Sequence, residues 1–391
     1  MMADSARLVG EALGGALSRE DANSLMNDWR TADLVHVAAR LRMQTHPGRI
    51  VTYSRKVFIN LVNLCRDTCS YCTYKKEPGD PVLSMMGPEQ VLALAEAGKR
   101  SRCTEALFVT GERPEQKYAE ASDWLRSHGH NSMVEFIEEL SGMVLEKTGL
   151  MPHTNAGSLT KKEMSLLKET NASLGVMLES SSERLMGPGM PHEDAPSKNP
   201  KVRVKTLESA GELRIPMTTG LLIGIGETPQ EVVDSLFAIK AIHEKYGNIQ
   251  EVIMQNFSPK PGTEMERILP PQHDYFLRTV AMARIILPDM NVQVPPNLNP
   301  EVYGAYLDAG INDWGGISPV TIDHVNPEFP WPSIPSVKKV TEGRGFRLRA
   351  RLPVYPEFIK DRFITSERIK QSIKLLADET GLVKEGYYAE H

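Results

Sequence analysis

Three of the four cysteines in this chain, Cys65, Cys69 and Cys72, lie within eight residues and have the spacing Cys-x-x-x-Cys-x-x-Cys. Thiolates are soft ligands that suit iron–sulfur clusters or zinc. A structural zinc ion takes four protein ligands, whereas three thiolates leave one cluster iron open to a substrate. The spacing therefore predicts an iron–sulfur cluster. A zinc site completed by Cys103 or a histidine is the alternative, although we expect Cys103 to be a small buried hydrophobe.

The elements that must position these cysteines follow a repeating pattern that begins at Lys56. Short apolar runs alternate with amphipathic stretches, and repeated strand–helix units specify a parallel sheet because parallel strands need long crossovers. The predicted strands are 57–62, 106–109, 152–155, 174–178, 217–225, 251–257, 292–295 and 309–314, and predicted helices include 88–98, 132–147, 159–169, 229–245 and 273–286. Eight units in roughly 250 residues predict an α/β fold, a closed (β/α)8 TIM-type barrel. A doubly wound open sheet is the alternative.

Before the barrel, residues 1–50 carry apolar side chains at near-helical spacing. Ser18, Asp21 and Thr31 stand where helix N-caps are expected. The pattern predicts a helical N-terminal extension, and a small separate helical module remains the alternative.

After the barrel, the pattern changes at about Asn326, where four closely spaced prolines interrupt regular structure. A basic stretch at 344–351 follows, and then a helix predicted over 356–378. We expect this part to be a tail packed on the barrel. The predicted organisation is thus an extension at 1–50, a barrel at 51–326 and a C-terminal tail at 327–391.

Composition narrows the class of protein. Hydrophobic residues make up 41% and charged residues 24%, which is typical of a soluble globular protein. The net charge of −5 argues against a nucleic acid partner. No apolar run reaches the roughly 18 to 20 residues that span a bilayer, and the first residues lack the pattern of a secretory signal. We expect a cytoplasmic protein without a membrane partner, in which clustered cysteines indicate metal or redox chemistry.

The cysteine segment, with Tyr71 directly before Cys72, resembles the signature of radical S-adenosylmethionine (SAM) enzymes. That resemblance implies a [4Fe–4S] cluster held by Cys65, Cys69 and Cys72, and SAM bound to the fourth iron through its amine and carboxylate. It also implies cleavage of SAM to a 5′-deoxyadenosyl radical. Tyr71 takes the family's aromatic position beside adenine, and packing within the loop is its alternative role.

The same resemblance assigns SAM contacts after the second predicted strand. Thr110, Gly111 and Glu112 resemble the family's Gly-Gly-Glu element, whose backbone carbonyls contact the SAM amine. Thr110 replaces the first glycine, which leaves a backbone role open. A turn alone would also explain Gly111.

Further SAM contacts are implied after the fourth predicted strand. The Glu179 carboxylate is placed to accept hydrogen bonds from the ribose diol, and a local helix cap is the alternative reading of its segment. Arg203, in the following helix, offers a guanidinium that matches the SAM carboxylate. Lys201 and Lys205 are competing candidates for that contact.

A glycine-rich segment at 220–227 resembles the family's Gly-x-Ile-x-Gly-x-x-Glu element, with Leu222 in place of isoleucine. The resemblance places Ile225 and Gly226 beside adenine. A dinucleotide-binding loop is rejected because the third glycine of that fingerprint is missing and Pro229 follows.

Five separated segments resemble one subfamily, the CofG subunits of 7,8-didemethyl-8-hydroxy-5-deazariboflavin (FO) synthase. They are 58–63, 218–227, 255–257, 293–298 and 314–319. The resemblance implies that a partner enzyme, CofH, joins the hydroxybenzyl part of tyrosine to a ribitylamino diaminouracil. The CofG subunit then abstracts a hydrogen atom from this adduct, closes the central ring and releases ammonia to give FO. A flavodoxin or ferredoxin is the expected electron donor.

The adduct is polar and planar, with a uracil edge, a ribityl chain and a phenol. Gln255, Asn256 and Asn297 are predicted at strand ends, where they could pair with uracil or ribityl groups. Asp313, near the end of the last predicted strand, and Ser318, after it, could bond ribityl hydroxyls, and Asp313 is the candidate for handling a proton. Local capping and turn formation are the alternative roles of these side chains.

His153, at the end of the third predicted strand, is the histidine to consider as an acid or base, and a purely structural role is its alternative. Two other functions stay open. One is a different barrel-type radical SAM enzyme, biotin-synthase-like or from a menaquinone pathway. The other is a zinc-stabilised subunit without enzymatic activity that binds CofH.

Overall fold

The computed structural model describes residues 2–388, so Met1 and residues 389–391 of the predicted extension and tail lie outside the described residues. Within the described part, eight parallel strands close into a barrel because β1 is hydrogen-bonded to both β2 and β8. The barrel strands are β1 (Ile50–Val62), β2 (Glu105–Thr110), β3 (Met151–Asn155), β4 (Ser173–Gly175), β5 (Met217–Ile223), β6 (Ile249–Asn256), β7 (Asn291–Gln293) and β8 (Asp313–Ile317). The predicted TIM-type barrel is confirmed, and the open sheet is wrong.

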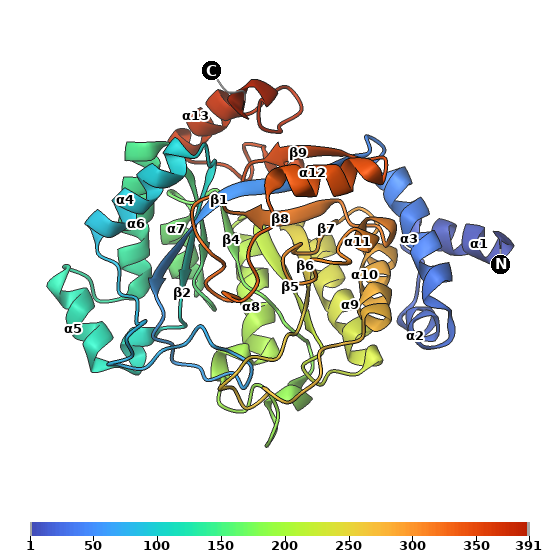
Figure 1. Cartoon of the computed structure of the whole chain (residues 1–391), viewed down its shortest axis with the longest axis horizontal. Coiled ribbons are helices and arrows are strands. Elements are labelled where there is room, and N and C mark those ends of the chain that lie inside the picture. Colours follow the sequence, from blue (N-terminus) through green and yellow to red (C-terminus); the bar gives the residue numbers. More distant parts are fainter. Residues whose placement is uncertain (1, 389–391) are drawn as a thin grey trace.

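Helices surround the strands, with α4 and α6 on one side of the barrel and α9 and α10 on the other (Figure 1). They are α4 (Pro88–Arg100), α5 (Ala119–Ser127), α6 (Met133–Thr148), α7 (Lys161–Leu167), α8 (Pro200–Glu212), α9 (Pro229–Tyr246), α10 (His273–Ile286) and α11 (Ala305–Asp308). Local chemistry sets several of their ends. Thr228 and Glu231 form a capping box at the start of α9, and Gly247, with φ of 66°, ends it.

The basic stretch in the tail forms a ninth strand, β9 (Arg347–Arg351), which the sequence reading missed. β1 is long enough to pair with two strands along the edge that does not face β8. Its later half pairs with β2, and its first half, from Ile50 to Ser54, pairs in parallel with β9. The helix α12 (Ile334–Gly343) leads into β9. The tail therefore extends the barrel sheet at the amino ends of its strands.

The helix predicted over 356–378 is corrected. Only a short turn at Pro356–Phe358 and the helix α13 (Glu367–Leu376) are helical. The intervening residues form an irregular segment in which Phe363 and Ile364 are 3% and 4% exposed. Burial of these two side chains against the core overrides the helical pattern of the sequence.

The N-terminal extension consists of three helices, α1 (Met2–Leu13), α2 (Arg19–Asp28) and α3 (Thr31–Thr45), and they pack beside α9 and α10 (Figure 1). Ser18 caps α2 by accepting a hydrogen bond from the Asp21 backbone, as predicted. The cap predicted at Thr31 is wrong, because Arg30 is the N-cap of α3 and the Thr31 hydroxyl donates to Asp274 at 2.7 Å.

The last strand of the barrel starts later than predicted. Ala309 and Ile311 are buried, but they belong to a turn around Gly310, whose φ is 93°. β8 then runs over Asp313–Ile317, so Asp313 begins the strand instead of lying near its end.

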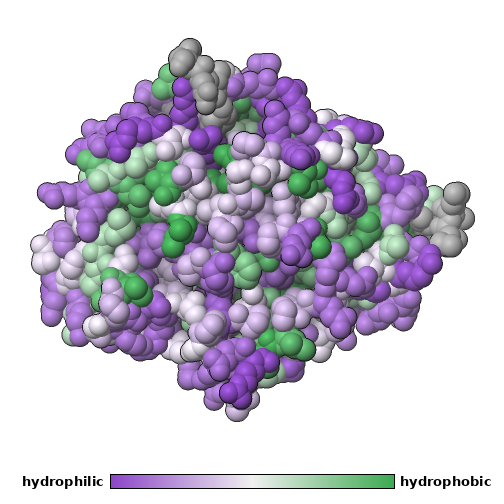
Figure 2. All heavy atoms as spheres, in the orientation of Figure 1, coloured by the Kyte–Doolittle hydropathy of each residue, from purple (hydrophilic) through white to green (hydrophobic). Residues whose placement is uncertain are grey.

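The surface of the visible face is mostly hydrophilic, with small separate apolar patches (Figure 2). Within residues 2–388, every helix is too short or too polar to cross a lipid bilayer.

Candidate active site

A chamber of about 350 Å³ lies inside the barrel and reaches the carboxyl ends of its strands. Its lining brings together most of the residues that the sequence singled out. These are Cys65, Cys69, Tyr71, Cys72, Thr110, Gly111, Glu112, His153, Glu179, Arg203, Gln255 and Asn256. They come from segments that are nearly 200 residues apart in the sequence, so the closed barrel is what assembles them.

The cysteine loop leaves the end of β1 and is held in place by the segment 191–198. The backbone of Thr68 donates to the Asp194 carbonyl at 2.8 Å, and the backbone of Ser70 donates to the Pro191 carbonyl at 3.0 Å. The Ser197 hydroxyl donates to the buried Asp67 carboxylate. The spacing between the cysteines is local, whereas their orientation depends on this distant segment.

The thiols lie in a low-dielectric environment. Burial raises the pKa of Cys65 to about 11 and the pKa of Cys69 to about 12, although the Lys198 ammonium acts in the opposite direction on Cys69. The Glu112 backbone N–H also donates to the Cys65 sulfur at 3.2 Å. Hydrogen bonds to sulfur and a nearby cation both stabilise thiolates that bind metal.

The donor set fits a [4Fe–4S] cluster. Each of three cluster irons takes one thiolate, so the thiols need not converge on a single point. Within residues 2–388, no three His, Cys, Asp or Glu side chains are arranged to hold a single metal ion.

Gly111 allows the end of β2 to approach the cysteine loop. A Cβ atom at this position would lie 1.9 Å from the Leu64 carbonyl oxygen, which no side chain could tolerate. The Gly111 N–H donates to the Val62 carbonyl at 2.7 Å, and the Thr110 hydroxyl donates to the same oxygen at 3.1 Å. A close backbone approach therefore explains the glycine better than a surface turn.

Glu112 has one satisfied and one unsatisfied carboxylate oxygen. Its Oε2 accepts from the Ser158 backbone at 3.0 Å and lies 3.9 Å from the Arg203 guanidinium. Its Oε1 is buried and accepts no hydrogen bond among the described residues, and the Arg113 Nε lies 3.7 Å away. A buried carboxylate oxygen without a hydrogen bond is costly, so this atom fits a bound amine or a similar donor.

Arg203 and Glu179 form the neighbouring wall. The Arg203 guanidinium donates to the carbonyls of Ser197 and Met177, at 2.7 and 3.2 Å. Although burial opposes ionisation, the Lys198 ammonium, at 2.5 Å, lowers the pKa of Glu179. Glu179 also has a φ of 63°, an uncommon value for a residue with a side chain. Backbone bonds to Gly220 and Leu222 of β5 hold it there.

Tyr71 points into an apolar cluster beside the cysteines. Its ring packs against a buried group formed by Leu185, Leu222, Ile225, Phe257 and Met265. Its hydroxyl lies 2.9 Å from His192 Nε2, and burial lowers the pKa of His192 to about 4. Tyr71 is thus both a packing residue and part of the chamber lining, and its two predicted roles are compatible.

Ile225 and Gly226 follow β5 but do not line the chamber directly. Ile225 is 2% exposed within the cluster around Tyr71, and the Gly226 carbonyl accepts from Arg184 at 2.6 Å. The Glu227 carboxylate accepts from the backbone of Gly224 and Ile225, at 2.7 and 2.9 Å, and shapes this turn.

Three predicted substrate residues lie outside the lining. Asp313 is fully buried at the amino end of β8, where its carboxylate accepts from Arg351 at 2.7 Å. The Ser318 hydroxyl oxygen accepts from the backbone of Val320 and Thr321, and so shapes a turn. Asn297 donates to the Asp323 carboxylate at 3.1 Å. For Ser318 this is the turn formation that was the alternative role, whereas the ion pair of Asp313 and the bond from Asn297 to Asp323 are tertiary contacts.

The sequence reading missed the polar floor of the chamber. Lys56 pairs with Glu105 at 3.0 Å, and Arg351 pairs with Glu251 at 3.0 Å. His153 on β3, which the sequence did single out, lines the same chamber, and its Nδ1 lies 2.6 Å from the Ser173 hydroxyl. Strand periodicity offered a signal, because residues two apart share a face, as in Glu251, Ile253 and Gln255 of β6. Lys56, Glu105 and Arg351 lie on three different strands, so only tertiary contacts bring them together.

Comparison with known proteins agrees with this geometry. Residues 59–239 match the Radical SAM superfamily. The chain is 49% identical to the 7,8-didemethyl-8-hydroxy-5-deazariboflavin synthase of Methanopyrus kandleri over 335 residues, which cover 86% of this chain and 100% of that one. The chain belongs to this family of radical SAM enzymes. Their superfamily uses a [4Fe–4S] cluster and SAM, which are therefore the cofactors of this chain.

Another relative is longer than this chain. The FO synthase of Streptomyces coelicolor is 42% identical over 392 residues, which cover 96% of this chain but 45% of that protein. More than half of that relative therefore lies outside the match.

Solved structures show the same fold at low sequence identity. The hydrogenase maturase HydG from Carboxydothermus hydrogenoformans has a TM-score of 0.73 at 19% identity, with 99% of this chain and 89% of that chain covered. Methylornithine synthase has a TM-score of 0.67 at 18% identity, with coverages of 87% and 97%.

Proposed function

We propose that this chain carries out the CofG step of FO synthesis. In this step a hydrogen atom is abstracted from the hydroxybenzyl–diaminouracil adduct made by CofH, the central ring closes and ammonia is released. The observation that supports the proposal is one chamber whose lining combines three thiols, two amides at the end of β6 and a floor of ionisable groups. The similarity to 7,8-didemethyl-8-hydroxy-5-deazariboflavin synthases adds support.

In the proposed arrangement, Cys65, Cys69 and Cys72 hold the cluster. When bound, the cluster and SAM supply the hydrogen-abstracting 5′-deoxyadenosyl radical. The protein's part is to fix the position of the reacting carbon and to exclude other hydrogen donors.

The SAM end of the chamber is assigned to four side chains. The free oxygen of Glu112 would accept from the SAM amine, in addition to the backbone contacts of residues 110–112. Arg203 would face the SAM carboxylate, Glu179 the ribose diol, and Tyr71 the adenine. For Glu179 this requires exchange or sharing of its bond with Lys198, which lies on the same chamber wall.

The substrate end is assigned to Gln255, Asn256 and the floor. The two amides follow Ile253 along β6, and both line the chamber. They would pair with uracil or ribityl groups. His153 is our candidate acid or base in place of Asp313, because Asp313 is already engaged by Arg351 and His153 lines the chamber. Burial lowers the pKa of His153 to about 4, so the imidazole is neutral at pH 7.

The resemblance to CofG subunits supports CofH as the enzyme that supplies the adduct. CofH would correspond to the unmatched part of the longer FO synthase. A flavodoxin or ferredoxin would deliver the electron that starts each turnover.

The test is anaerobic turnover of the reconstituted protein with SAM, a reductant and the CofH product, followed by mass spectrometry and fluorescence. Formation of both 5′-deoxyadenosine and fluorescent FO is expected. 5′-Deoxyadenosine without FO, given intact adduct, would point to a different radical SAM enzyme. Bound zinc, with neither product formed, would support the non-enzymatic alternative.

Cysteine variants supply the controls for this assay. Cys69→Ala should lose both products and most of the iron, because a cluster ligand is removed. Cys103→Ala is the matched control, since Cys103 is buried just before β2 and does not line the chamber. It should retain both the iron and the products.

A further inference from the structure

The segment 318–333, which follows β8, forms a wall over the chamber. Hydrogen bonds from β1 and from the loops after β6 and β7 hold it in place. The Phe58 backbone in β1 donates to the Thr321 hydroxyl oxygen at 3.0 Å. Lys260, after β6, donates to the Val325 carbonyl. Asn297, after β7, donates to the Asp323 carboxylate at 3.1 Å and to a carbonyl of the same segment at 3.3 Å.

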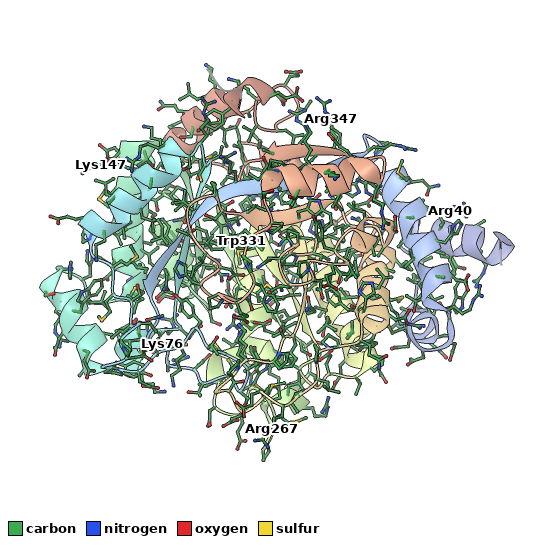
Figure 3. All side chains as sticks on the ribbon, in the orientation of Figure 1. Arg40, Lys76, Lys147, Arg267, Trp331 and Arg347 are labelled. Carbon is green, nitrogen blue, oxygen red and sulfur yellow. The ribbon has the colours of Figure 1, made fainter. Side chains whose placement is uncertain are left out.

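These ties set the position of Trp331, near the end of the segment. Trp331 lines the chamber and appears near the centre of the view in Figure 3, whereas the labelled Arg40, Lys147 and Arg267 appear at its edges. Its ring stacks on the Phe58 ring, with centroids 5.3 Å apart and planes 21° apart. Because Phe58 also lines the chamber, the two rings form one aromatic wall.

Trp331 lacks a partner for its polar atom. Its indole Nε1 is buried and has no hydrogen-bond acceptor among the described residues. The buried Trp314 offers a contrast, because its indole N–H donates to the Thr341 hydroxyl at 3.0 Å. A buried donor without an acceptor costs on the order of 1 to 3 kcal/mol, so the Trp331 indole fits a ligand that carries an acceptor.

We propose that Trp331 and Phe58 bind the pyrimidinedione ring of the substrate. The flat ring would stack against the aromatic wall, and one of its carbonyl oxygens would accept from the Trp331 indole N–H. This inference rests on the proposed function, since it assigns one end of the same substrate. In this arrangement Asn297 is a positioning residue, because it holds the segment that carries Trp331 and does not touch the ligand itself.

Position favours the substrate over SAM as the occupant of this wall. Tyr71, beside the cysteines, packs with residues around β5 in a separate apolar cluster. Trp331 and Phe58 instead join the segment after β8 to β1, and Lys56 of the floor lies 5.6 Å from the Phe58 ring. The wall therefore belongs to the polar end of the chamber.

Two substitutions separate stacking from hydrogen bonding. Trp331→Phe keeps an aromatic ring and removes the N–H, and it should weaken equilibrium binding of the adduct about 5- to 10-fold. Trp331→Leu removes both contacts and should weaken it by about 100-fold. The KM for SAM should change less than about twofold in both variants. In the Leu variant, 5′-deoxyadenosine should form in excess over FO, because the adduct is poorly held.

Trp124→Phe is the matched control, because Trp124 packs against His128 and Phe136 on the outer helices and does not line the chamber. It should bind the adduct like the wild type. Iron content should be the same in all variants, and each variant should be fully folded at the assay temperature. Unchanged adduct affinity in Trp331→Leu, or an equal loss of affinity for SAM, would overturn the inference. If the wild type binds the adduct and forms no FO, the proposed function fails while the binding comparison still decides the role of Trp331.

Discussion

The two carboxylate oxygens of Glu112 are bonded unequally. Ser158 and Arg203 engage Oε2, whereas Oε1 accepts no hydrogen bond among the described residues and lies 3.7 Å from the Arg113 Nε. If Oε1 accepts from the SAM amine, Glu112→Gln removes a charge-assisted hydrogen bond worth about 1.5 to 3 kcal/mol. The KM for SAM should then rise about 10- to 100-fold, which steady-state kinetics of 5′-deoxyadenosine formation can measure.

The matched control is Glu120→Gln, which changes an exposed carboxylate on α5. It should leave the KM for SAM unchanged. An unchanged KM in Glu112→Gln itself, with the cluster intact, would show that the free oxygen has another purpose.

His153 predicts how stability depends on pH. Burial lowers its pKa from the ordinary 6.5 to about 4. Between these values the unfolded chain binds a proton that the folded chain does not, so the free energy of unfolding falls as pH decreases from about 6.5 to 4. The loss should be about 3 kcal/mol for this group alone. Urea unfolding from pH 8 to 4.5 should show this decline, and His153→Gln should make it shallower.

The decline should not vanish in that variant, since burial also lowers the pKa of His192 to about 4 and that of His46 to about 3. His36→Gln, on the exposed face of α3, is the control and should retain the wild-type slope. A His153→Gln slope equal to that of the wild type would contradict the prediction.

At the scale of elements, β9 joins the C-terminal tail to the barrel sheet by pairing with β1. Its last residue, Arg351, is 2% exposed and pairs with Asp313 on β8 and Glu251 on β6. The Tyr355 hydroxyl donates to Glu251 at 2.8 Å in the same network. One cation therefore joins the tail to two barrel strands.

Removing that cation should be costly. Arg351→Met would leave two buried carboxylates without their partner, and the expected loss is about 3 to 5 kcal/mol in the free energy of unfolding. Arg347→Met, on the same strand, removes an exposed pair with Glu385 and should cost less than about 1 kcal/mol. Denaturant unfolding of both variants tests the comparison, and equal losses would show that the network is not what fastens the tail.

At the scale of the whole molecule, the N-terminal helices cover the barrel's outer helices. Leu34, Val37, Ala38 and Leu41 of α3 are at most 1% exposed, and α3 packs along α10. Arg42 extends the contact, because its guanidinium donates to the Ile311 carbonyl at 3.1 Å beside β8. Such contacts favour one cooperative unit over a separate helical module.

Leu41→Ala tests this integration. The variant opens a cavity between α3 and the barrel, and it should lower the free energy of unfolding by about 2 to 5 kcal/mol. Calorimetry should still show a single transition at a lower temperature. Leu13→Ala on α1, where Leu13 is 43% exposed, is the control and should cost little. Two separate transitions would instead support an independent module at residues 1–50.

The sequence by itself determined the features whose causes are local. The spacing of Cys65, Cys69 and Cys72, the capping box of α9 and the alternation of strands and helices are all read within a few residues or one repeat. The barrel could be predicted because each strand–helix unit obeys the same rule, and the polar ends of parallel strands must then meet on one face.

Only the tertiary structure decided which distant groups meet. Lys198 pairs with Glu179, His192 bonds Tyr71, and Arg351 reaches Glu251 across one hundred residues. No local pattern encodes these partners, since a buried ion pair depends on where two separate segments are brought by the rest of the fold. The same is true of Trp331. Trp331 lies in a proline-rich stretch. Its place in the chamber could not be predicted, because irregular segments have no periodicity from which the direction of a side chain can be inferred.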